Sequence, residues 1–115
     1  MNEETFQRVK TACEKFIAEG GSIVTASWGV RRDERGQWYC VNGTKCACAF
    51  GAFMLTEQPP VEDNRIDVAT AEALGVPLSK VDSFVEGFDQ GDEDQAEDIE
   101  WYRAGERLRS ELLGY

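Results

Sequence analysis

The chain has 115 residues, enough for one hydrophobic core, and the sequence predicts a single globular domain spanning residues 1–115. Its 22 acidic and 12 basic residues give a net charge of −10, which opposes the phosphate contacts of a nucleic-acid-binding protein and favours a basic partner. The sequence contains no histidine, which removes the commonest general base and metal ligand.

The first half of the chain is expected to form a helix, a hairpin and a second helix. Apolar side chains recur every three or four residues between Phe6 and Ile17, which predicts an amphipathic helix over 3–19. The segments SIVTASWGV and QWYCV are rich in β-branched and aromatic residues and flank a polar turn at 31–36, as in a two-stranded hairpin. The apolar run 46–55 has no polar face, so we expect a helix buried nearly all round.

The second half is expected to be helical. Asp67 is predicted to cap a short helix that ends at Leu74, and Ser79 to start a second one that ends at residue 88, with the sequence LGVP forming the corner between them. A charged connection then leads into a last helix over about 96–113, in which Trp101, Leu108 and Leu112 share one face. The sequence therefore predicts an α+β fold that is mostly helical, with four or five helices and one small β-hairpin.

The stretch DVATAEALGVPLSKVDSFVEGF, residues 67–88, resembles the helix-turn-helix of many bacterial regulators. A recognition helix needs cations for phosphates and donors for base edges. From Leu78 to Asp89 this helix offers one cation, Lys80, against Asp82, Glu86 and Asp89. The charge argues against direct DNA binding, and a helix-turn-helix-like regulator is kept only as an alternative function.

An acidic run is the most prominent feature of the charge pattern. Between Asp82 and Glu100 the sequence contains nine acidic residues and no basic one. Such a run is either a solvated face or a docking surface for a basic protein, in its sharpest form a mimic of nucleic acid. We interpret the chain as a non-enzymatic acidic interaction module. The predicted partner-binding residues are Glu86, Asp89, Asp92, Glu93, Asp94, Glu97 and Asp98.

The start of the chain, MNEETFQRVK, lacks the basic and apolar regions of a secretion signal, and no run approaches the about 18 apolar residues of a membrane helix. A cytoplasmic protein without membrane contact is therefore expected, with its four cysteines as thiols.

Three cysteines lie close together in the sequence and suggest an alternative function. Cys40, Cys46 and Cys48 could serve a small metal- or redox-dependent protein, with zinc as the metal, although their spacing differs from paired zinc knuckles. Cys13 falls on the apolar face of the first helix, where a thiol behaves as a small hydrophobe. No catalytic motif is present in the sequence, so no catalytic residue is assigned and no cofactor is expected. The oligomeric state is left open.

Overall fold

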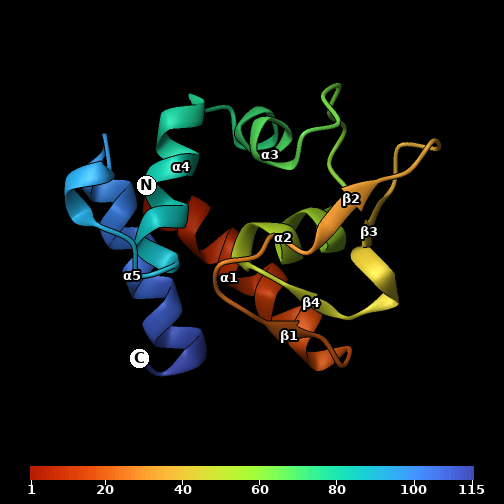
Figure 1. Cartoon of the computed structure of the whole chain (residues 1–115), viewed down its shortest axis with the longest axis horizontal. Helices are drawn as coiled ribbons and strands as arrows, with labels where there is room; N and C mark the ends of the chain where they lie inside the picture. The colour runs from red at the N-terminus through yellow and green to blue at the C-terminus, as the bar shows by residue number, and fades with distance from the viewer.

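The computed structural model describes the backbone of residues 1–115 and every side chain except that of Asn42. It confirms a mostly helical α+β fold with one small antiparallel hairpin (Figure 1). In chain order the elements are α1 (Glu3–Ala18), β1 (Ser22–Ile23), β2 (Val30–Arg32), β3 (Trp38–Cys40), the short 3-10 helix η1 (Val41–Gly43), β4 (Cys46–Ala47), α2 (Ala49–Glu57), α3 (Ile66–Leu74), α4 (Leu78–Phe88), a second 3-10 helix η2 (Glu93–Gln95) and α5 (Ile99–Leu113).

Helix α2 forms the centre of the molecule. Figure 1 shows it between the α4–α5 pair on one side and the β2–β3 hairpin on the other. All residues from Ala49 to Met54 are buried, as the lack of a polar face predicted. The Phe50 ring stacks on Phe84 of α4 with centroids 4.3 Å apart and also faces Trp28, 6.2 Å away. These aromatic contacts connect α2 to α4 and to the loop that precedes β2.

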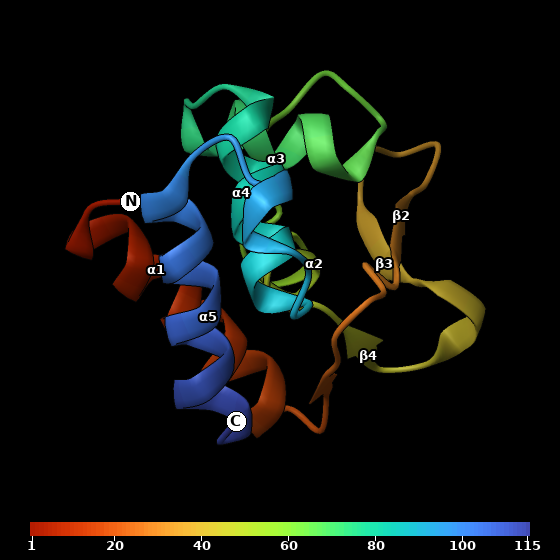
Figure 2. The ribbon, with the colours of Figure 1, turned by 60° about the vertical axis from the view of Figure 1, so that its left-hand side comes forward.

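Helices α4 and α5 pack against each other more extensively than any other pair of elements (Figure 2). Their backbones meet at two glycines. A Cβ atom on Gly105 would lie 2.8 Å from the backbone nitrogen of Phe88, and a Cβ on Gly87 would lie 2.9 Å from the backbone carbon of Tyr102. Both distances are shorter than ordinary van der Waals contact, so the close approach depends on glycine at both positions.

The strands form two separate pairs. β2 and β3 are antiparallel, with Val30 opposite Cys40, so the predicted hairpin is present. Its first strand lies later than predicted: Arg31 and Arg32 belong to β2 rather than to the turn, and Val30 alone of the segment 22–30 takes part. β1 and β4 are parallel, with Ser22 opposite Cys46, a pairing that the sequence did not predict. Residues 46–47 are therefore extended rather than helical. α2 begins at Ala49 because the Cys48 sulfur accepts a hydrogen bond from a backbone N–H of its first turn.

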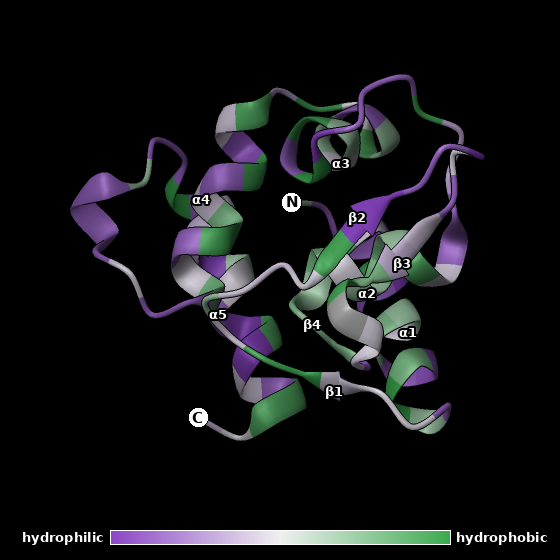
Figure 3. Cartoon of the chain, turned by 45° about the vertical axis from the view of Figure 1, so that its right-hand side comes forward, coloured by the Kyte–Doolittle hydropathy of each residue, from purple (hydrophilic) through white to green (hydrophobic). Residues whose placement is uncertain are grey.

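The other helix boundaries differ from the predictions by a few residues. α3 begins at Ile66, with Arg65 rather than the predicted Asp67 in the cap position, so Asp67 lies in the first turn of the helix. α5 begins at Ile99 rather than near residue 96, because the Asp98 carboxylate caps its first turn. The preceding acidic residues form η2 and its flanking turns, which Figure 3 shows as a hydrophilic stretch between α4 and α5. Within the described part of the chain, no helix combines the length and the apolar character needed to cross a membrane.

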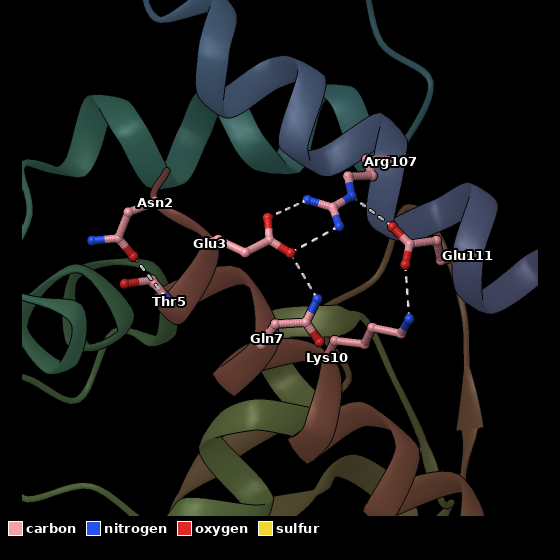
Figure 4. A network of polar contacts seen from close by, with 7 residues as sticks. All are labelled: Asn2, Glu3, Thr5, Gln7, Lys10, Arg107 and Glu111. Atoms are coloured by element: carbon pink, nitrogen blue, oxygen red, sulfur yellow. Dashed lines mark hydrogen bonds and ion pairs between the residues drawn. The ribbon is translucent and has the colours of Figure 1, made fainter.

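Ion pairs join α1 to α5 at the surface (Figure 4). Arg107 of α5 contacts Glu3 at 2.7 Å and Glu111 at 2.7 Å, and Glu111 also contacts Lys10 of α1 at 2.7 Å. The Arg107 guanidinium lowers the pKa of Glu3 to about 2. The Asn2 side chain caps α1 by accepting a hydrogen bond from the backbone N–H of Thr5. The network holds α1 against α5.

Candidate partner-binding site

A cavity of about 430 Å³ opens between α3, α4 and the segment that follows η2. We call it the acidic cleft, because four of its side chains are carboxylates and, among the residues described, none is Lys or Arg. Its lining consists of Trp28, Asp67, Leu78, Ser79, Asp82, Ser83, Val85, Glu86, Gln95 and Glu97.

The carboxylates of the acidic cleft lie close enough to repel one another. Partial burial raises the pKa of Asp82, and the charges of Asp67 and Glu97 raise it further. Arg65 opposes this shift from outside the cleft, where it pairs with Asp67 at 3.3 Å through a side chain that is 70% exposed. Asp82, Glu86 and Glu97 form no ion pair with any residue that the structure describes. The cleft therefore carries uncompensated negative charge.

The seven predicted partner-binding residues are divided between the cleft and other roles. Glu86 and Glu97 line the cleft. Asp98 caps α5 and pairs with Lys80 at 2.9 Å, so its pKa is lowered, and Glu93 pairs with Arg103 at 2.9 Å. Asp94 is exposed.

Asp89 and Asp92 stabilise the chain around the cleft. The Asp92 carboxylate caps η2. Asp89 accepts a hydrogen bond from the backbone N–H of Ala26 at 2.8 Å, where Ala26 has the unusual φ of 64°. This bond connects the end of α4 to the loop that carries Trp28, and it holds the loop where Trp28 forms one wall of the cleft. Burial raises the pKa of Asp89, as expected for a carboxylate whose main partner is a single amide.

Sequence reasoning missed three contributors to the cleft. Asp82 was counted in the acidic run but not assigned to a site, and Asp67 was interpreted as a helix cap. Trp28 was interpreted as a hairpin residue, yet it is only partly buried and lines the cleft. Asp67 and Asp82 could have been assigned to the cleft from the helical spacing of acidic residues in α3 and α4. Trp28 could not, since its approach depends on the Asp89–Ala26 hydrogen bond between distant segments.

The four cysteines do not gather at one place. Cys13 and Cys48 are buried, and burial raises the pKa of Cys48 to about 12. Cys46 is exposed, and Cys40 is partly buried. In the described residues, no group of three or more Cys, Asp or Glu side chains is arranged to hold a metal ion. Neither the three cysteines proposed as zinc ligands nor the carboxylates of the cleft form such a group.

The α3–α4 corner forms the two predicted helices, but the surface it presents is the acidic cleft. Lys80, the one basic residue of α4, is already paired with Asp98. Chemically, the cleft offers carboxylate acceptors and an aromatic wall, which together suit an ammonium or guanidinium group. Comparison with protein-family models, curated proteins and solved structures finds no match for this chain.

Proposed function

We propose that the chain is a non-enzymatic, cytoplasmic binding module that takes a Lys or Arg side chain of a basic protein partner into the acidic cleft. The observation that carries this proposal is the convergence of Asp82, Glu86 and Glu97, without paired cations, on one cavity. Trp28 supplies an aromatic wall on which a guanidinium or ammonium group gains cation–π energy.

Electrostatics favours a cationic guest over an empty cleft. The raised pKa of Asp82 means that its ionised form is disfavoured by partial desolvation and by Asp67 and Glu97. A bound Lys or Arg side chain would offset the repulsion among these carboxylates. Relief of that repulsion, which is already present in the free protein, would therefore contribute to the binding free energy. The net charge of −10 would add long-range attraction and speed association at low salt. A nucleic-acid mimic is the special case in which the partner's basic surface also binds DNA or RNA.

An oligoarginine peptide is a suitable probe, with binding measured by calorimetry over a salt series. The double variant Asp82→Asn with Glu97→Gln removes two charges from the cleft. The matched control, Glu14→Gln with Glu34→Gln, removes two charges from exposed positions on α1 and on the hairpin turn. We expect the cleft variant to bind about tenfold more weakly and the control to change by less than about twofold. Equal losses for both variants would show that net charge alone binds the peptide, and would refute the proposed site.

A second experiment separates the mimic from an ordinary basic partner. Once a partner is captured, duplex DNA is added as a competitor. Displacement of the chain by DNA supports mimicry, whereas a ternary complex contradicts it. A gel-shift of the chain with duplex DNA at low salt tests the regulator alternative, and we expect no shift because Lys80 is paired.

A further inference from the structure

The structure separates the cysteines into a buried and an accessible set. Cys13 donates its S–H to the Ala49 carbonyl and Cys48 caps α2, both inside the core. Cys46 is exposed, and Cys40 lines a second surface cavity of about 400 Å³. Only the accessible set is open to solutes, since thiol exchange requires access for the attacking sulfur.

The backbone brings Cys40 and Cys46 together. The chain between them reverses direction, because the Thr44 N–H donates to the Val41 carbonyl at 3.3 Å. The Val41 N–H also donates to the Gly29 carbonyl at 2.9 Å, and a Cβ atom added to Gly29 would clash with the Cys46 carbonyl oxygen, so the Gly29 and Cys46 backbones lie close together. Gly29 therefore contacts the chain next to both cysteines and holds the two ends of the reversal at one place.

The surroundings of the Cys40 sulfur agree with this geometry. Burial raises the pKa of the Cys40 thiol, and the neighbouring Cys46 thiol raises it further. The backbone N–H of Cys46 and the ammonium of Lys45 act in the opposite direction. The Cys46 sulfur is three covalent bonds from that backbone nitrogen, so both sulfurs lie in one small region.

We propose that Cys40 and Cys46 are a dithiol pair that low-molecular-weight disulfides oxidise to an intramolecular disulfide. The exposed Cys46 thiolate attacks one sulfur of the disulfide RSSR, whose S–S bond breaks and releases RS⁻, which takes up a proton. The Cys40 thiol gives its proton to solvent and attacks Cys46 Sγ, which breaks the bond to the second RS group. The products are two RSH and the Cys40–Cys46 disulfide, so RSSR gains the two electrons and two protons that the thiols lose.

The bond would change the second cavity. Cys40, Gly43, Thr44 and Lys45 contribute to its wall, and all lie in or beside the segment that the disulfide closes. Oxidation would hold that wall, and the β3–β4 connection, in one conformation. This site is separate from the acidic cleft, so its failure would leave the proposed function untouched.

The test treats the folded protein with oxidised glutathione in a glutathione buffer, blocks free thiols with iodoacetamide after denaturation, and measures masses. We expect two of the four thiols to be lost and no glutathionyl adduct to accumulate. Trypsin cleaves after Lys45, between the two cysteines, so the disulfide appears as peptide 36–45 linked to peptide 46–65, with the iodoacetamide label on Cys48 located by fragmentation.

Two variants make the result specific. Cys40→Ser lacks the second thiol and is expected to accumulate one glutathionyl group on Cys46. Cys13→Ala leaves the pair intact and is expected to give the same linked peptides as the wild type. The proposal is overturned if the wild type keeps the adduct on Cys46 without the linked peptides, or if Cys48 is consumed before Cys40.

Discussion

Replacing Gly105 by alanine should destabilise the protein through the contact between α4 and α5. In the structure, the added Cβ atom lies 2.8 Å from the Phe88 backbone nitrogen and 3.0 Å from the Phe84 carbonyl carbon, and it is closer still to the Phe84 oxygen. These atoms belong to the backbone of α4, so no side-chain rotation relieves the clash. The two helices must move apart.

Two effects of opposite sign set the magnitude. Overpacking a close contact costs about 1–3 kcal/mol, and a clash with backbone lies at the upper end of that range. Alanine in a helix interior is favoured over glycine by about 1 kcal/mol, which offsets part of the cost. We therefore expect the free energy of unfolding to fall by about 2 kcal/mol. The separation also weakens the packing of buried Phe84 and Phe88.

Urea unfolding followed by tryptophan fluorescence measures this change, since Trp101 is buried in α5. With a slope of about 1–3 kcal/mol per molar, the midpoint should fall by about 1 M. Ser110→Ala, at an exposed position of α5, is the matched control and should raise stability by at most about 0.5 kcal/mol. If Gly105→Ala is as stable as the wild type or more stable, the helices do not meet as described.

Three further predictions concern charge and hydrogen bonding. Asp82→Asn should leave stability at pH 7 unchanged or raise it by up to about 0.5 kcal/mol. The folded state raises the pKa of Asp82, so it binds the Asp82 proton more readily than the unfolded state does. The free energy of unfolding of the wild type, relative to that of the variant, should therefore rise as pH falls through that pKa. Urea titrations of both proteins at pH 7 and pH 4 measure this difference. Gln58→Ala should cost about 1–2 kcal/mol, because the Gln58 amide bonds both the N–H and the carbonyl of Trp38. The control Gln58→Gly should cost less in thermal unfolding, since residue 58 has a φ of 45°. Because pairing with Arg107 lowers the pKa of Glu3 to about 2, the wild type should lose this pair's stabilisation as pH falls from the ordinary Glu pKa of 4.5 towards about 2. Glu3→Gln lacks the carboxylate and should not show this loss. Acid unfolding curves of the two proteins measure this, and coincident curves would contradict the role of that pair.

Local patterns accounted for most of the secondary structure. The spacing of apolar residues in α1 and the wholly apolar run of α2 were sufficient, because both reflect which side chains must leave water. The β2–β3 hairpin was also predicted, from two short β-rich segments around a polar turn, although its first strand proved to begin at Val30 and to include two residues of the predicted turn. β1 and β4 were not, since a parallel pair of two residues each has no local signal and depends on contacts between distant segments.

For the candidate site, the sequence indicated the charge but not its geometry. Counting acids singled out Glu86 and Glu97, and the structure places both in the lining of the cleft. The count of acidic residues could not show that Lys80 pairs with Asp98 or that Arg103 pairs with Glu93. Each of these ion pairs joins residues from different elements, which the sequence alone does not bring together.

The sequence by itself determined that the chain is mostly helical, with one small hairpin and an excess of negative charge. Each of these follows from composition or from spacing within one segment, where the physics is local. The tertiary structure alone decided how α4 and α5 approach at Gly87 and Gly105, and that Trp28 closes the cleft beside Asp82. It also decided which cysteines are accessible. These features depend on packing between segments far apart in the chain, and a pattern within one segment does not contain that information.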